Sequence, residues 1–389
     1  MCHCVGAEMS TLFLLGVFSL FLRINAITAF TFHSPEGFAL VQRILLAALP
    51  TFESHSYQMD GICKVLDKID LVAVTPTGSG KTGFLLLTII VMIAIAAKPS
   101  LCSSVTFPKD PAIVVVCPTN SIDQQMMGVL LLIIPQFTLK TVQLLHEFGE
   151  KTFGSKPARL ISKGFADLLK YEPFYDRVCA LRVDEIHLLV LWGLGFHKAL
   201  AQIGFMQARF RVGIPIIGLT ATLLSDAKVS DAIFDLLGVN RREFYLLRRS
   251  NARHDIQILF RTLYSGIDGL YFPELGWVVK NNDKTIIFGT TISLVFRIKI
   301  YLDSLLPKAV NRDLRVRAYD SINWPEENLE TIVLFKSDPR CQVIVATNSL
   351  AQGNNIPVTK TVIQVGKPES AEMFVQKPGR ARPNVTNPR

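Results

Sequence analysis

The stretch Thr75-Pro-Thr-Gly-Ser-Gly-Lys-Thr82 follows the short apolar run Leu71–Val74. This order predicts a buried strand, a glycine-rich turn and then a helix that begins at about Thr82. Glycines let backbone N–H groups converge on phosphates, while Lys81 can reach the β- and γ-phosphates and Thr82 can ligate Mg²⁺. The stretch therefore predicts a nucleotide site, although Thr75 replaces the usual first glycine. An ordinary glycine-rich turn would leave the Lys-Thr pair unexplained.

Composition is compatible with two α/β domains. The chain has 389 residues, of which 49% are apolar and 19% are charged, as expected for strands buried on both faces. The net charge of +9 favours a polyanionic partner such as nucleic acid, and a merely basic enzyme is the alternative. The seven cysteines form no CxxC pair, so we expect neither zinc nor a disulfide framework.

Two apolar stretches could suggest a membrane, and neither is long enough to cross one. Thr11–Leu22 is short, and no Lys or Arg precedes it, so a packed helix or a leader segment is expected. Phe84–Ala97 directly follows the glycine-rich turn and predicts a buried helix.

Short apolar runs recur along the whole chain and predict buried strands. They are Leu71–Val74, Ala112–Cys117, Val178–Val183, Ile214–Leu219, Thr285–Phe288, Gln342–Ala346 and Thr361–Val365. Helical stretches such as Gly164–Leu169 and Lys198–Arg209 alternate with them, which predicts parallel sheets. The arginine-dense segment Asn240–Arg253 predicts a connection between two domains. Its arginines either face a cleft that holds phosphates or form a solvated linker.

A second polar group follows a predicted strand. Asp184-Glu185-Ile186-His187 comes directly after Val178–Val183. Asp184 is suited to hold Mg²⁺ through water, and Glu185 is suited to orient or deprotonate the water that attacks the γ-phosphate. His187 would lie where the state of the nucleotide is sensed. Alone, such a pair is usually a solvated turn, but its position after a phosphate loop favours the catalytic interpretation.

With these motifs the chain resembles superfamily-two helicases, and within them the RecQ-like DNA helicases, over residues 35–383. Asp184–His187 resembles the DEAH box, and Gln58 matches the glutamine that reads adenine. Three further matches are Pro118-Thr119, which grips DNA, Leu219–Thr222, which couples hydrolysis to strand separation, and the aromatic-rich loop Leu191–His197. In that loop Trp192 and Phe196 could stack on unpaired bases, and core packing is the alternative.

The second half carries weaker matches. Lys284–Thr291 resembles the opening strand of the second helicase domain, and Ala346–Asn355, with Thr347, resembles the motif that contacts DNA and nucleotide. Gln376–Arg382 resembles the final motif, in which Arg380 or Arg382 would act as the arginine finger.

Several positions depart from the family pattern. Arg382 stands where glycine is expected and Pro383 where the finger arginine is expected. Asn355 replaces an aspartate, and His197 replaces an arginine. The zinc-binding and winged-helix modules of many RecQ-like enzymes do not fit into the remaining residues, as in a fungal-type variant without them. These changes leave the expectation of ATP binding in place and put strand separation in question.

The resemblance implies two tandem RecA-like α/β domains, each a mostly parallel sheet flanked by helices. The expected divisions are an apolar segment 1–34, a first domain 35–245 and a second domain 246–389. ATP and Mg²⁺ would bind on the first domain. The expected ATP-binding residues are Gln58, Thr77, Gly78, Ser79, Gly80, Lys81 and Thr82, the metal residues are Thr82 and Asp184, and the coupling residues are His187, Thr220, Thr222 and Gln376.

The implied activity is ATP-dependent 3′→5′ unwinding of DNA in recombination or repair, in the nucleus, with the cytoplasm as the alternative. The partner would be single-stranded DNA or a duplex with a single-stranded overhang. The alternatives are a DNA-stimulated ATPase that translocates without unwinding, a non-catalytic nucleic-acid-binding relic, and an RNA helicase, which the aromatic loop disfavours.

Overall fold

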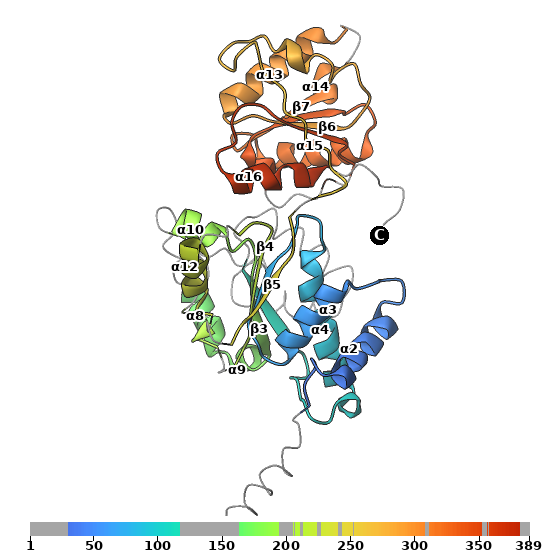
Figure 1. Cartoon of the computed structure of the whole chain (residues 1–389), viewed down its shortest axis with the longest axis vertical. Coiled ribbons are helices and arrows are strands. Elements are labelled where there is room, and N and C mark those ends of the chain that lie inside the picture. Colours follow the sequence, from blue (N-terminus) through green and yellow to red (C-terminus); the bar gives the residue numbers. More distant parts are fainter. Residues whose placement is uncertain are drawn as a thin grey trace, which may run out of the picture.

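The computed structural model describes residues 30–116, 163–193, 205, 207–210, 213–223, 227–239, 243–251, 253–307, 311–351, 356 and 358–381. Within these residues the chain forms two α/β domains joined near residue 250, each built on a parallel sheet (Figure 1). The expected class of two tandem RecA-like domains is therefore confirmed.

The first sheet has the strand order β2-β3-β4-β1-β5. Its strands are β1 (Leu71–Val74), β2 (Ala112–Val116), β3 (Val178–Val183), β4 (Ile216–Thr220) and β5 (Tyr245–Arg248). All described pairings are parallel, so the carboxyl ends of the strands lie along one edge. In open α/β sheets, this edge is where ligands bind.

Helices cover both faces of the first sheet. One face carries α2 (Pro35–Ala48), α3 (Ser56–Leu66) and α4 (Lys81–Ala97), and the other carries α8 (Lys163–Lys170), α10 (Leu188–Gly193) and α12 (Ala227–Leu237) (Figure 1). The short elements are α9 (Glu172–Tyr175) and the 3₁₀ turn η1 (Pro99–Leu101). Helix α4 is apolar around most of its circumference, which explains why it is almost fully buried from Phe84 to Met92.

The second sheet has the strand order β7-β8-β6-β9, again all parallel. Its strands are β6 (Thr285–Phe288), β7 (Val316–Tyr319), β8 (Val343–Ala346) and β9 (Thr361–Gln364). The helices are α13 (Ile292–Leu305), α14 (Arg312–Arg315), α15 (Pro325–Ser337) and α16 (Ala371–Gln376), with 3₁₀ turns η3 (Pro273–Leu275), η4 (Asn348–Ala351) and η5 (Pro378–Arg380). Helix α16 lies on the side facing the first domain (Figure 1).

The structure corrects one sequence-based expectation and adds one strand. Tyr245–Arg248 is not part of a linker but an edge strand that pairs with β1, so the first sheet extends three residues beyond the expected boundary at 245. Val316–Tyr319 is a second strand that hydrophobicity did not predict. Both strands are half-exposed and contain an arginine, so they lack the continuous apolar run of a buried strand.

Among the described residues, no helix is long and apolar enough to cross a membrane. The apolar run Thr11–Leu22 lies outside those residues.

Candidate active site

The phosphate loop is shaped by two left-handed glycines. Gly78 has φ +84° and Gly80 has φ +79°, a region where a side chain would be strained. Gly80 is the N-cap of α4, so the helix begins at Lys81 with its N-terminus directed at the loop. Free N–H groups and the helix dipole at such an end favour an anion.

Helix α3 braces this loop. Gln58 Nε2 donates to Gly80 O at 2.9 Å, Gln58 Oε1 accepts from His55 N at 3.0 Å, and Tyr57 donates its hydroxyl proton to Ser79 O. The Gln58 side chain lies so close that a Cβ on Gly83 would stand 2.6 Å from its Nε2. In this structure Gln58 supports the phosphate loop, and its reading of adenine stays a prediction.

The loop retains donors suited to a phosphate. Within the described residues, the hydrogen bond of Lys81 Nζ is a long one to Thr75 O, at 3.4 Å. The hydroxyl oxygens of Thr75 and Ser79 are buried and have no hydrogen-bond partner within the described residues. Because unpartnered buried polar groups cost free energy, these groups fit a ligand rich in acceptor oxygens, such as a nucleotide triphosphate.

Backbone hydrogen bonds bring the second motif to the same edge. Strand β4 lies between β3 and β1, and Ile186 N donates to Leu219 O while Thr75 N donates to Thr220 O. The motifs at the ends of β1, β3 and β4 are thereby held side by side. Glu185 itself adopts φ +48°, an uncommon conformation for a residue with a side chain and a feature often found at functional sites.

Glu185 is ionised in this setting. Burial by itself would raise the pKa of Glu185, but the contact with His187 and the positive charges of Lys81 and Arg380 outweigh it and hold the pKa at about 2. Its Oε2 lies 3.3 Å from His187 Nδ1. The carboxylate is therefore charged at neutral pH and able to accept a proton from water.

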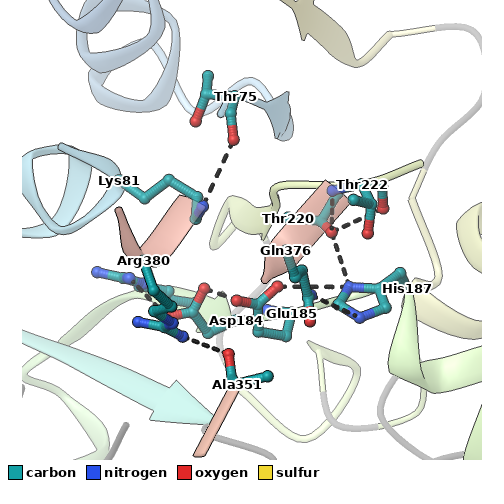
Figure 2. Close-up of polar contacts among 11 residues, drawn as sticks. Thr75, Lys81, Asp184, Glu185, His187, Thr220, Thr222, Ala351, Gln376 and Arg380 are labelled. Atoms are coloured by element: carbon teal, nitrogen blue, oxygen red, sulfur yellow. Dashed lines mark hydrogen bonds and ion pairs between the residues drawn. The ribbon is translucent and has the colours of Figure 1, made fainter. Parts of the chain in front are cut away.

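His187 connects the two domains (Figure 2). Its Nδ1 lies 2.9 Å from Thr220 Oγ1, and its Nε2 lies 3.2 Å from Gln376 Nε2 in α16. Thr220 donates its hydroxyl proton to Thr222 O at 2.8 Å, so Thr220 Oγ1 must accept from His187. His187 thereby lies between the end of β4 in the first domain and helix α16 in the second.

The final motif also approaches the phosphate loop. A Cβ on Gly379 would lie 2.7 Å from the Thr77 Cβ, so glycine permits this contact. Arg253, from the segment joining the domains, donates to Thr77 O at 3.3 Å and to Ala381 O at 3.4 Å. Arg380 donates to Ala351 O, and its positive charge lowers the pKa of Glu185 (Figure 2). Groups from both domains therefore converge on one site.

Two family descriptions match the chain. "DEAD/DEAH box helicase" matches residues 55–229, and "Helicase conserved C-terminal domain" matches residues 271–384. Both match the domains that form the site.

The chain carries a DEAD/DEAH box helicase domain and a helicase C-terminal domain.

Similar curated proteins confirm the RecQ-like resemblance of this chain. It is 25% identical over 363 residues to "ATP-dependent DNA helicase Q1" of Rattus norvegicus, covering 88% of this chain and 53% of the rat protein. It is 27% identical over 231 residues to "ATP-dependent DNA helicase RecQ" of Haemophilus influenzae, covering 58% of this chain and 33% of that protein. The chain thus spans between a third and about half of the length of these two relatives.

Solved structures of helicases share the fold. Mss116p bound to ssRNA and AMP-PNP matches with a TM-score of 0.67 and 19% identity, covering 92% of this chain and 73% of that one. The DUF1998 helicase MrfA bound to DNA and AMPPNP matches with a TM-score of 0.64 and 18% identity, covering 88% of this chain and 48% of that one. At these identities the likeness shows the arrangement of two helicase domains.

Some of the predicted site residues are not among the described residues. The residues outside the described ranges are Pro118, Thr119, Phe196, Asn355, Arg382 and most of Lys198–Arg209. Trp192 lies in α10, but its side chain is not among those described. Thr347 is described at the end of β8, where its hydroxyl lies 2.8 Å from that of Ser349. The nucleic-acid roles of these residues stay predictions.

Residues that motif matching missed also lie at the helicase site. Arg182 is fully buried and bonded to Asp184, and Arg253 joins Thr77 to Ala381. The ring of Tyr57 stacks with the His55 ring, and the Arg249 guanidinium also lies over the Tyr57 ring. The arginine density of 240–253 did signal a cleft-facing role, and the structure supports it for Arg253. Arg182 had a signal too, as a charge inside an apolar strand.

Replacing Gln376 by alanine should uncouple the two domains of the helicase. The variant loses the buried contact with His187, so we expect stimulation of ATP hydrolysis by DNA to fall at least tenfold while the basal rate stays within threefold. Gln342→Ala is the matched control, because the Gln342 amide donates to Asn282 within the second domain. Equal losses of basal and stimulated rates would assign Gln376 a structural role instead.

Replacing Gly379 by alanine should hold the domains apart. The new methyl group would lie 2.7 Å from Thr77 Cβ, so the final motif must retreat from the phosphate loop. We expect the maximal hydrolysis rate to fall about tenfold or more, with little change in nucleotide affinity of the first domain. Gly269→Ala, which meets only a backbone atom at 3.9 Å, should behave as wild type. A Gly379→Ala enzyme with the wild-type rate would contradict this packing.

Proposed function

We propose that the protein couples ATP hydrolysis to 3′→5′ movement along DNA and to unwinding of a duplex with a single-stranded overhang, in recombination or repair. The observation that carries the proposal is the hydrogen bond between His187 of the DEAH box and Gln376 of the second domain. Through this bond, a change at the nucleotide alters how the two domains sit, and their relative movement would advance the enzyme along a strand.

The residues of the site have different roles in ATP hydrolysis. The turn from Thr77 to Thr82 cradles the phosphates, with Lys81 on the β- and γ-phosphates. Glu185 accepts the proton of the attacking water, which its ionised state permits. Arg380, or Arg382, offsets the negative charge that develops in the transition state. Mg²⁺, held by Thr82 and by Asp184 through water, would supply further positive charge beside the phosphates.

The choice of DNA, the direction and the location follow from the resemblance to RecQ-type helicases. The net charge of +9 supports a polyanionic partner in general. The nucleus is the proposed location, with the cytoplasm as the alternative. Unwinding of RNA is the competing activity, and the structural likeness to Mss116p bound to ssRNA makes it the second candidate to test.

ATP turnover with and without nucleic acid tests the proposal. We expect hydrolysis to rise at least tenfold with single-stranded DNA and less with RNA. Lys81→Ala should lower the stimulated rate at least a hundredfold, because the phosphates lose their one loop cation. Lys98→Ala, at the opposite end of α4, is the matched control and should leave the rate unchanged.

Three other outcomes separate the alternatives. Stimulated hydrolysis without separation of a labelled duplex would make the protein a translocase. Tight DNA binding with no hydrolysis would make it a non-catalytic binding protein. Stimulation by RNA alone would exclude the DNA helicase.

The direction of movement has its own test. A duplex with a 3′ overhang that is unwound faster than a duplex with a 5′ overhang would confirm the 3′→5′ direction.

A further inference from the structure

A buried arginine lies two residues before Asp184 on strand β3. Arg182 has no solvent exposure, and its cross-strand neighbours Val115 and Ile217 are buried aliphatic residues. Its Nη2 donates to Asp184 Oδ2 at 3.0 Å, while Nε and Nη1 have no hydrogen-bond partner within the described residues. Burying a charge with unsatisfied donors opposes folding, so packing alone does not account for this residue.

The ion pair with Arg182 engages the Asp184 carboxylate, which is the group suited to hold the metal. Side chains two residues apart on a strand point to the same face, which places the guanidinium behind Asp184. Both carboxylate oxygens are engaged, Oδ2 by Arg182 and Oδ1 by Glu185 N at 3.1 Å. The negative charge of Asp184 is therefore balanced from within the protein before any cation arrives.

Arg182 differs from the other cations near the site. Lys81 and Arg380 act on Glu185, and both are partly exposed. Arg182 is buried and its one described partner is Asp184. An effect of Arg182 on the site must therefore pass through the Asp184 carboxylate.

We propose that Arg182 is a positioning residue that competes with free divalent cations for Asp184, so that the cation enters only together with the phosphates of a nucleotide. This inference rests on the proposed function. A free cation would meet a carboxylate that is already neutralised and a guanidinium that repels it. The phosphates of a nucleotide bring further negative charge and shift the balance toward the cation.

A titration with Mn²⁺ in the absence of nucleotide, followed by electron paramagnetic resonance, tests the proposal. Wild type should bind Mn²⁺ weakly, and Arg182→Met should bind it at least tenfold more tightly. Arg177→Met is the matched control, because Arg177 precedes the same strand and donates to Asp110 O at 2.7 Å. Its Mn²⁺ affinity should equal that of wild type.

Two further variants assign the effect to the pair. Adding Asp184→Asn to Arg182→Met should remove the gain in affinity. Arg182→Lys restores a positive charge and should return the affinity to the wild-type value. Should Arg182→Met fold poorly, Arg182→Gln removes the charge while keeping a donor, and the same gain is expected. Unchanged Mn²⁺ affinity in the uncharged variants would overturn the proposal.

Binding of fluorescent ADP with Mg²⁺, measured on the same samples, distinguishes a failure of the role of Arg182 from a failure of the proposed function. If wild type binds this nucleotide and Arg182→Met shows no gain in Mn²⁺ affinity, only the role of Arg182 fails. If wild type does not bind the nucleotide, the proposed function fails, and the role of Arg182 fails with it.

Discussion

Replacing Glu185 by glutamine should leave ATP bound and reduce its hydrolysis by a factor of about 10²–10⁴. Glutamine keeps the size of the side chain but cannot accept a proton from water. The contact with His187 and the positive charges of Lys81 and Arg380 outweigh burial and hold the pKa of Glu185 at about 2, so wild type carries the charged base throughout the neutral range. Single-turnover hydrolysis of labelled ATP measures the rate, and a fluorescent ATP analogue measures the affinity.

The control for this variant is Glu172→Gln, an exposed glutamate at the start of α9. We expect wild-type hydrolysis from it. A Glu185→Gln enzyme that hydrolyses ATP within threefold of wild type would assign the base to another residue. A parallel loss of ATP binding would show that the carboxylate shapes the site rather than activating water.

Replacing Asp184 by alanine should lower the free energy of unfolding by about 3–5 kcal/mol, because it leaves the buried Arg182 charge without a partner. Urea denaturation without nucleotide or metal measures this change. The effect is large because two nitrogens of the guanidinium, Nε and Nη1, already lack a hydrogen-bond partner among the described residues.

Two comparisons define the origin of that loss. Asp167→Ala breaks an exposed pair with Lys170 and should cost at most about 1 kcal/mol. The double variant Arg182→Met/Asp184→Ala should regain most of the stability, since no uncompensated charge remains. If the double variant is as unstable as Asp184→Ala alone, the loss comes from the turn and not from the charge.

The sequence predicted the parts of the site that are local in the chain. The phosphate loop and the DEAH turn are each encoded within about eight residues, next to strands whose apolar runs are easy to recognise. Parallel pairing then brings the ends of β1, β4 and β3 together without further information. For this reason, residues assigned by motif, such as Lys81 and Glu185, lie around one site.

Features that depend on contacts far apart in the chain could not be predicted. The Arg253 guanidinium joins carbonyls of residues 77 and 381, and nothing in its own neighbourhood specifies either one. The internal bonds of Gln58 depend on how α3 packs against the phosphate loop. Strands β5 and β7 escaped prediction because half-exposed strands tolerate arginine and lose the apolar signature.

The close approach of Gly379 to Thr77 has a consequence for the timing of the catalytic cycle. The second domain touches the loop on which the phosphates would rest, so we expect nucleotide exchange to require the two domains to part. Spent nucleotide then leaves at a rate set by opening rather than by its own affinity. A covalent cross-link between the two domains should therefore slow nucleotide exchange in both directions. Nucleotide bound before cross-linking should stay bound, and nucleotide added afterwards should fail to bind.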